Sequence, residues 1–385
     1  MTTARPPWVI VSAGFHFRGG QAKAVAGLAD FLARSSHPVH LVGHEFDARL
    51  AAAPHVTVHP VRRPLRTDAL GNVLLARAGR SIARQVTTAD PAARVVVNGG
   101  NCDWADINWA HYLHAAFTPD LHLAPRWFRA KERLIGAWYR QRERQAIRAA
   151  RLVLTNSRRT TADVIDCLGV PAARVKVVYY GADPAWAPPT DDDRRRGREA
   201  FGLRLDRPVV AFVAGFGYDN RKGFDTLLEA WKRVCRSPNW DAELVLAGGG
   251  KAATDVAGWL AREGLAGRAR MVGFTDRVFD LLAGADLLVS PVRYEPYGLN
   301  VQEAICRGVP AIVSATAGVA EEYPVDLAEM LLPDPGDVDA LAAKLLRWRA
   351  DIPGWKSRFR PLSDRLRSRT WDDMAREIVS VVKGE

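Results

Sequence analysis

Two carboxylates flank a predicted helix start in the second half of the chain. Glu295 and Glu303 lie in DLLVSPVRYEPYGLNVQEAICRGVPAIVS, residues 286–314, which predicts a strand, a short loop, a helix opening near Gly298 and another strand. Eight helical residues rise about 12 Å, so the two carboxylates can reach opposite ends of an extended ligand. Ionised carboxylates accept hydrogen bonds from sugar and ribose hydroxyls. Taken alone, this spacing occurs often by chance and is more typical of a Glu295 that caps the helix and a Glu303 that is a solvated surface charge.

The same helix start offers a place for an anion. Val301, Ala304 and Ile305 recur at helical spacing, so they form the face packed on a sheet, and Glu303 points away from that face. The unpaired amides around Gly298, Leu299 and Asn300 face outward with the positive end of the helix dipole. A diphosphate suits such a site.

Two cations follow the first predicted strand of the second half. FVAGFGYDNRKGFDTLLEAW reads as a strand, a glycine-containing loop with Arg221 and Lys222, and a helix. Arg can bind phosphate oxygens in a bidentate manner and Lys can act as a point charge, which would stabilise a leaving diphosphate. Positive charge beside a helix N-terminus is unfavourable without an anion. The alternative interpretation is a basic helix start on the surface.

Alternating short apolar runs and amphipathic segments predict the elements that position these residues. In the second half the predicted strands are PVVAFVAG, AELVLAG, ARMVGF, DLLVSPV and VPAIVSA; in the first half they are WVIVSA, HPVHLVG, RVVVNGG, INWAHYL, RLVLTNS and RVKVVYY. We therefore expect an α/β fold with two Rossmann-like, doubly wound domains. Ligand then belongs in the crevice between them, at the carboxyl ends of the strands.

The domain boundaries follow from composition. The chain has 385 residues, about right for two domains. Residues 184–207 are rich in Pro and in charged residues and lack a strand pattern, so we predict a linker there. The N-terminal domain is then 1–183 and the C-terminal, ligand-binding domain 208–369.

Composition and motifs indicate in which cellular compartment the protein works and whether it needs a metal. Hydrophobic residues make up 48% and charged residues 25%, which is ordinary for a globular protein. The four cysteines are far apart, and the N-terminus resembles no secretory signal. A cytoplasmic location is expected. The acidic runs 191–193 and 337–339 fall in the linker and at a helix start, so we expect no metal.

The basic charge lies in the first half, where residues 1–190 hold 25 Lys and Arg against 13 Asp and Glu. Its densest part is 126–151, in which nine basic residues are interleaved with aromatic ones. This segment is typical either of a surface helix whose aromatics face the core or of a helix that docks on an anionic membrane. Nucleic acid is not expected, because no recognition module is present.

Residues 208–323 resemble the retaining family 4 glycosyltransferases of the GT-B fold. The resemblance rests on AGFGYDNRKGFD, on the AGGG turn at 247–250, on the stretch 295–303 and on SATAGVAEE. Gly19 and Gly20, TNS at 155–157 and VVYYGAD agree more loosely. The terminal TWDDMAREIVSVV resembles a helix, 370–385, that crosses back onto the first domain in such enzymes. Many relatives carry an Arg where this chain has Phe216, so either Arg221 replaces that Arg or the diphosphate is bound differently.

What the resemblance implies can be placed residue by residue. Glu303 would bind the donor ribose and Glu295 the transferred sugar. Amides of Tyr297, Gly298, Leu299 and Asn300, with Gly249, Gly19 and Gly20, would line the donor, and Arg221 with Lys222 would bind its diphosphate. His114 in INWAHYLHAAF is at the position of the family's functional histidine, and His111 competes for that role. The catalytic set is then His114, Glu295 and Lys222.

The expected activity is a metal-independent transfer of a sugar from a nucleotide diphosphate sugar, UDP-linked or GDP-linked, to an acceptor hydroxyl with retention of anomeric configuration. Such a hexosyltransferase-like enzyme needs no cofactor. The alternative is a nucleotide-sugar epimerase or hydrolase of the same architecture. The acceptor, whether glycan, lipid-linked or a small molecule, is not readable from the sequence, and the basic segment would place the enzyme at the inner face of the membrane.

Overall fold

A computed structural model describes residues 5–64, 67–121 and 124–384 of the chain, which divide into two compact units. Unit 1 consists of Met1–Thr118, Arg126–Gly181 and Thr370–Glu385; unit 2 consists of Pro119–Pro125 and Ala182–Arg369. Residues 1–4, 65–66 and 122–123 of the predicted first domain, and residue 385 of the predicted returning helix, lie outside the described part of the chain.

Unit 1 contains a seven-stranded sheet with the order β5-β3-β1-β6-β7-β8-β9, and its strand pairs are parallel. The strands are β1 (Trp8–Val11), β3 (Val39–Gly43), β5 (Val56–Pro60), β6 (Arg94–Asn98), β7 (Ile107–Ala110), β8 (Leu152–Thr155) and β9 (Val175–Val177). A small second sheet pairs β2 (Gly14–Phe15) with β4 (Glu45–Phe46). Most residues of β1, β6, β7 and β8 are buried, which explains their continuous apolar runs.

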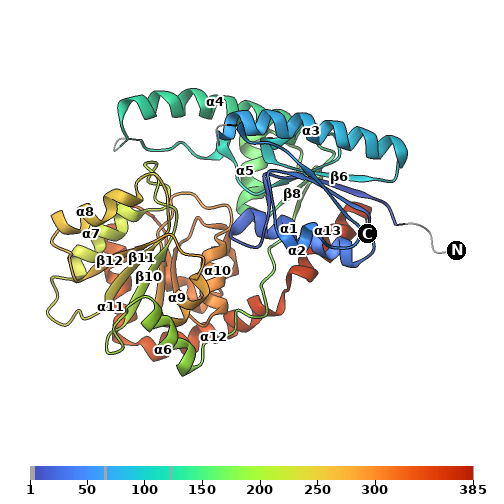
Figure 1. Ribbon diagram of the computed structural model, residues 1–385. Helices are drawn as coiled ribbons and strands as arrows, with labels where there is room; N and C mark the ends of the chain where they lie inside the picture. Colours follow the sequence, from blue (N-terminus) through green and yellow to red (C-terminus); the bar gives the residue numbers. More distant parts are fainter. Residues whose placement is uncertain (1–4, 65–66, 122–123, 385) are drawn as a thin grey trace. The chain divides into compact units, whose positions relative to one another are not determined.

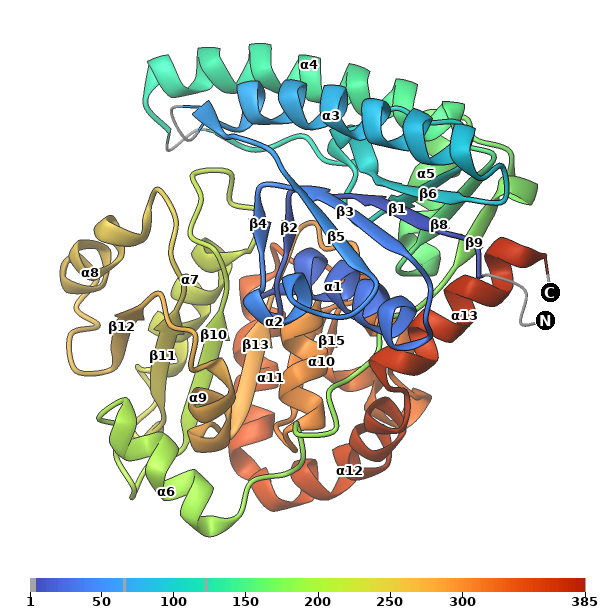
Figure 2. The same ribbon diagram turned by 45° about the vertical axis from the view of Figure 1, so that its right-hand side comes forward.

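Helices cover both faces of this sheet. On one face lie α3 (Asp68–Ala89), α4 (Arg126–Ala149) and α5 (Arg158–Leu168), with α3 and α4 side by side in Figures 1 and 2. On the other lie α1 (Gly20–Arg34), the short α2 (Ala48–Ala51) and α13 (Trp371–Lys383), which packs along α1. The returning C-terminal helix therefore belongs to unit 1.

Unit 2 contains a six-stranded parallel sheet with the order β12-β11-β10-β13-β14-β15. The strands are β10 (Val209–Val213), β11 (Glu243–Ala247), β12 (Ala269–Gly273), β13 (Leu287–Ser290), β14 (Ala311–Ser314) and β15 (Leu331–Leu332). The strand order reverses between β10 and β13, and in doubly wound sheets such a switch point is where ligands bind. The two sheets confirm the predicted α/β architecture of two Rossmann-like units.

The helices of unit 2 are α6 (Asp191–Ala200), α7 (Phe224–Val234), α8 (Ala253–Arg262), α9 (Val278–Gly284), α10 (Leu299–Cys306), α11 (Val338–Ala350) and α12 (Ile352–Ser368). α11 packs against α7, α6 packs against α9, and α12 packs against α10.

The segment 184–207, expected to be a linker, is instead part of unit 2. It contains α6, whose first turn is capped by Thr190 and Asp193 in a reciprocal capping box. The acidic run 191–193 is therefore a helix start with its charges at the favourable end of the dipole. The charged composition of this segment indicated a solvent-exposed linker. One of its charged residues, Arg198, is instead almost completely buried.

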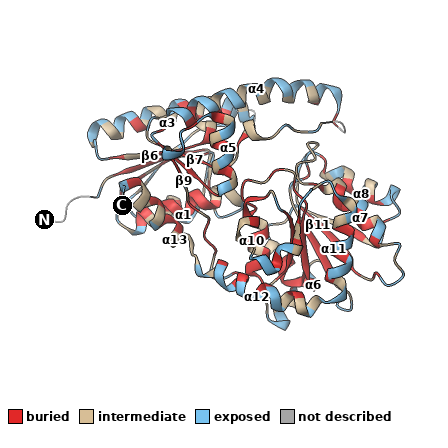
Figure 3. Cartoon of the chain, turned by 180° about the vertical axis from the view of Figure 1, so that it is seen from behind, coloured by how far each residue is buried: buried red, intermediate tan, exposed pale blue. Residues whose placement is uncertain are grey.

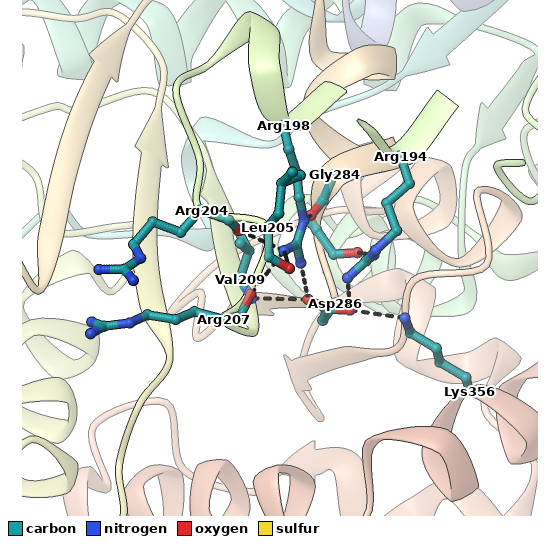
Figure 4. A network of polar contacts seen from close by, with 10 residues as sticks. Arg194, Arg198, Arg204, Leu205, Arg207, Val209, Gly284, Asp286 and Lys356 are labelled. Carbon is teal, nitrogen blue, oxygen red and sulfur yellow. Dashed lines mark hydrogen bonds and ion pairs between the residues drawn. The ribbon is translucent and has the colours of Figure 1, made fainter. Parts of the chain in front are cut away.

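Arg198 belongs to a polar network centred on the buried Asp286 (Figure 4). The Asp286 carboxylate accepts hydrogen bonds from Arg194, Arg198 and Lys356, at 2.6, 2.8 and 2.9 Å. It also accepts a hydrogen bond from the Val209 amide at 3.0 Å. This one carboxylate therefore joins α6, α12 and the start of β10 to β13.

Candidate active site

The loops that follow β10 and β13 are joined at the switch point of the second sheet. The Arg293 amide donates to the Arg221 carbonyl at 2.8 Å. Gly223 has φ 68°, and a Cβ placed there would lie 1.8 Å from the Pro291 carbonyl oxygen. Only glycine allows this close approach. The two loops predicted to carry the cations and the first carboxylate therefore come together.

Lys222 and Glu295 meet directly at this junction. The Lys222 ammonium donates a hydrogen bond to the Glu295 carboxylate, and the two side chains are 20% and 17% exposed. Arg221 lies beside Asp219, with 3.6 Å between Nε and Oδ2. Two of the three proposed catalytic groups, Lys222 and Glu295, thus occupy the same small volume.

Arg293, which the sequence analysis did not single out, fixes the cationic loop. Its guanidinium donates to both oxygens of Asp225 at 2.7 Å and to the Asn220 carbonyl at 2.7 Å. Asp225 lies in the first turn of α7. A bidentate pair of this kind specifies orientation as well as adding attraction. Arg293 therefore holds the Arg221–Lys222 segment against the start of α7.

The predicted helix opens where expected, as α10 after its N-cap residue Gly298. Val301, Ala304 and Ile305 are fully buried, while Glu303 on another side of the helix is partly exposed. The Gly298 φ of 106° places the residue in a conformation that favours glycine. α10 therefore directs Glu303 away from the core, as the spacing predicts.

Side chains around the start of α10 have structural partners. The Asn300 amide group donates to the Val213 carbonyl at 2.9 Å, which ties α10 to the end of β10. The hydroxyl of the buried Tyr297 donates to Gln302. The side chains of Tyr297 and Asn300 thus contact other parts of the protein, and donor binding by their main-chain amides stays a prediction. Leu299 is the first residue of the helix.

Phe216, the departure from the family pattern, is part of the core. Its ring is 3% exposed and packs against Phe212 and Phe224, with centroids 5.6 and 5.3 Å away. Its amide donates to the carbonyl of Gly249 at 2.8 Å. This side chain points into apolar surroundings, and the basic residues of this loop are Arg221 and Lys222.

The two candidate histidines differ sharply in their surroundings. His111 is 5% exposed, and its Nδ1 contacts the Tyr180 hydroxyl. Burial lowers the pKa of His111 to about 3, so its ring is neutral. His114 has a side chain that is 43% exposed and lies in a short 3-10 helix, His114–Ala116, rather than at a strand end. His114 is therefore the histidine that a ligand can reach.

Glu143, a residue of α4 that sequence reasoning missed, contacts His114. It accepts hydrogen bonds from the His114 amide at 2.9 Å, from His114 Nδ1 at 3.0 Å and from the Ala115 amide at 3.1 Å. No sequence motif links these residues, which lie 29 positions apart. An acid within an Arg-rich helix is expected to form a surface ion pair, whereas Glu143 is buried.

Gly19 and Gly20 lie at the start of α1 in unit 1. Gly19 is the N-cap residue and Gly20 the first helical residue. A Cβ placed on either glycine would meet no described atom within 4 Å. Open space therefore borders this helix start.

A pocket of about 310 Å³ in unit 2 lies between the cationic loop and helices α7 and α8. Its apolar walls include Phe216, Phe224, Leu228 and Trp259. Of the predicted site residues it contacts only Lys222. Among the described residues no group of three or more metal-ligating side chains is found, and no helix is long and apolar enough to cross a membrane.

Two family profiles match the chain, one in each half. The family profile described as "Glycosyltransferase Family 4" matches residues 18–186. The profile described as "Glycosyl transferases group 1" matches residues 207–351. Together the two matches reach both units.

A curated relative and two solved structures agree with these matches. An uncharacterized glycosyltransferase of Methanocaldococcus jannaschii is 27% identical over 60% of this chain and 59% of its own length. The chain spans about half the length of other curated relatives that it matches. The sucrose-phosphate synthase of Thermosynechococcus elongatus is similar with a TM-score of 0.76, 21% identity and 99% coverage of both chains. Anabaena HepE, solved with UDP and glucose, has a TM-score of 0.68 and 18% identity, covering 99% of this chain and all of its own. These two structures support the GT-B fold.

Proposed function

Because the chain belongs to the group 1, family 4 glycosyltransferases of the GT-B fold, we propose that it transfers a sugar from a nucleotide diphosphate sugar to an acceptor hydroxyl with retention of anomeric configuration. The observation that carries the proposal is the convergence of Lys222 and Glu295 at the switch point of the second sheet. A cation for the diphosphate and an acceptor for sugar hydroxyls are the two groups that such a donor requires.

In the proposed reaction the diphosphate lies against Lys222, Arg221 and the amides that open α10. The bond from the anomeric carbon to the diphosphate oxygen breaks, and its electron pair leaves with the diphosphate. The acceptor oxygen bonds to the anomeric carbon on the same face, and its proton passes to the departing phosphate oxygen. Lys222 stabilises the charge that develops on the diphosphate.

Glu295 and Glu303 bind the two ends of the donor in this proposal. Glu295 accepts hydrogen bonds from hydroxyls of the transferred sugar, and Glu303 accepts hydrogen bonds from ribose hydroxyls. His114 contacts the transferred sugar through its exposed ring. No protein nucleophile takes part, and no metal or cofactor is required, because Arg221 and Lys222 supply the positive charge that a metal would bring.

HepE, whose solved complex contains UDP and glucose, supports a uridine donor as the first to test. The experiment is a thermal-shift panel of uridine, guanosine and adenosine diphosphate sugars, followed by product analysis with and without acceptors. A donor at about 100 times its Kd adds roughly 2.7 kcal/mol to the stability of the protein. Sugar isomerisation or release as the sole outcome across a broad acceptor panel would contradict the transferase proposal.

We further propose that the outer face of α4, defined by Trp127, Ala130, Leu134 and Ala137, docks on an anionic lipid surface. Trp127 is 68% and Leu134 76% exposed, and much of α4 is pale blue in Figure 3. Residues seven apart lie on one side of a helix, so these apolar groups form a stripe. Arg126, Arg133 and Arg140 are exposed beside it at the same spacing. Exposed apolar groups flanked by arginines are complementary to anionic headgroups.

Vesicle sedimentation tests the outer face of α4. The protein should sediment with phosphatidylglycerol vesicles, less at high salt, and remain in solution with phosphatidylcholine vesicles. Trp127→Ala with Leu134→Ala should abolish sedimentation, while Leu205→Ala, an apolar site in unit 2 that is 64% exposed, should not. Sedimentation that survives the double change, or binding to nucleic acid in place of vesicles, would overturn this proposal.

A further inference from the structure

Glu143 is a buried carboxylate whose three hydrogen bonds all lead to His114 and its neighbour. The side chain is 1% exposed. Its Oε1 atom accepts hydrogen bonds from the His114 amide and from His114 Nδ1. Its Oε2 atom accepts a hydrogen bond from the Ala115 amide. A buried carboxylate is costly unless such donors satisfy it. These contacts explain how an acid is tolerated at this position of α4.

The bond to the imidazole goes beyond what capping a 3-10 helix requires. Two backbone amides would be enough to fix the turn at His114–Ala116, yet Oε1 is shared with the ring. An ionised carboxylate can only accept, so Nδ1 carries a proton. In the neutral ring the lone pair then resides on Nε2.

Two tyrosines fix the plane of the same ring. Tyr139, also on α4, stacks on His114 with centroids 5.2 Å apart and an angle of 14°. Tyr112 meets the ring edge-on at 5.0 Å and 80°. The imidazole is therefore constrained in rotation as well as in proton position, while its side chain stays 43% exposed.

We propose that Glu143 is a positioning residue that holds His114 in the Nδ1–H tautomer, with Nε2 presented as an acceptor to a hydroxyl of the transferred sugar. This inference rests on the proposed contact between His114 and the sugar. A carboxylate behind a histidine fixes its tautomer and raises the basicity of the outer nitrogen, as it does for metal-binding histidines. Glu143 itself touches no substrate.

Nitrogen-15 NMR of the imidazole and a double-mutant cycle test the proposal. The wild-type spectrum should show His114 protonated on Nδ1. Glu143→Gln keeps the size of the side chain but turns an NH2 group toward one of the three donors, so a share of the rings should convert to the Nε2–H tautomer. Turnover of the full-length enzyme should fall roughly 10–100-fold, the range seen when such partners are removed elsewhere.

The cycle distinguishes positioning from general structure. In a His114→Ala background, Glu143→Gln should cause no further loss, because the residue acts through the ring. Glu132→Gln on the same helix is the matched control and should leave turnover unchanged. An Nε2–H tautomer in the wild type, or full additivity of the two losses, would overturn the proposal. If the enzyme transfers no sugar, the proposed function fails, yet the NMR measurement still decides whether Glu143 sets the tautomer.

Discussion

The Lys222 ammonium donates a hydrogen bond to the Glu295 carboxylate. The two residues follow neighbouring strands, β10 and β13, and neutralise each other when no ligand is bound. In the proposed complex the diphosphate would share Lys222 with Glu295, whereas the sugar beyond it would need Glu295 as a hydrogen-bond acceptor. The Glu295 carboxylate thus weakens binding of the diphosphate of the proposed donor and strengthens binding of its sugar.

Glu295→Gln should separate these two effects. Removing the negative charge should tighten the binding of a free nucleoside diphosphate several-fold, because Lys222 no longer has a competing anion. Turnover of the intact donor should fall, since an amide oxygen is a weaker acceptor than a carboxylate. Calorimetry with UDP or GDP measures the affinity for the diphosphate, and an initial-rate assay measures turnover. Glu263→Gln, an acid on the same unit, is the control, and weaker diphosphate binding in Glu295→Gln would refute the competition.

Lys222→Ala should lower turnover by about 100–1,000-fold, the range expected when a charge-stabilising donor is removed. The fold should persist, because the loop is also joined by Arg293 to Asp225 and Asn220. Lys232→Ala, near the end of α7, is the matched change and should have little effect on rate. Near-normal turnover in Lys222→Ala, with an unchanged melting temperature, would remove the leaving-group role.

Gly223→Ala should strongly destabilise unit 2. Both Gly223 and Gly267 have positive φ, at 68° and 79°, so alanine strains the backbone at either site by about 1–2 kcal/mol. Only at Gly223 would the new Cβ also collide with a backbone oxygen, that of Pro291. Thermal unfolding should therefore show a much larger loss for Gly223→Ala than for Gly267→Ala. Equal losses would mean that the two loops separate without cost.

Phe216→Arg should not restore the family's usual phosphate contact. The side chain would enter the apolar space between Phe212 and Phe224, and burying an unpaired guanidinium there should cost on the order of 4 kcal/mol. Chemical denaturation measures that loss, and Phe216→Leu is the milder comparison. Tighter diphosphate binding with unchanged stability would show that position 216 can reach the ligand.

Asp286 should make folding stability dependent on pH in the acid range. Burial raises the pKa of this carboxyl, but Lys356, Arg194 and the Val209 amide outweigh burial, so the net shift is downward. Because the pKa is lower folded than unfolded, where it is about 3.9, the stabilisation is complete above about pH 4 and is lost as pH falls further. Asp286→Asn should lose about 3–5 kcal/mol at pH 7 and should flatten the acid part of the profile. Asp206→Asn, at an exposed pair with Arg204, should change little.

The sequence predicts those features of the site that depend on local pattern. The spacing of Val301, Ala304 and Ile305 fixes which side of α10 is buried, and Gly298 marks where the helix begins. Strand periodicity places the loops of Lys222 and Glu295 at one edge of a sheet. Whether these residues bind a donor stays a prediction that the experiments above address.

Contacts between distant segments could not be predicted. The contact between His114 and Glu143 depends on how α4 packs, which periodicity alone does not give. The helix in 184–207 was missed because its charged composition outweighed the Thr190–Asp193 capping signal. Arg198 is buried only because Asp286 and several carbonyls receive it.

The buried ring at position 216 has a consequence for how relatives of this chain are recognised. A search that demands an arginine at position 216 would discard this chain, although Arg221 and Lys222 lie farther along the same loop. A better criterion is spatial: a basic residue anywhere between the strand and its helix that reaches the acid after the neighbouring strand. Chains dismissed as inactive on the first criterion are worth re-examining on the second.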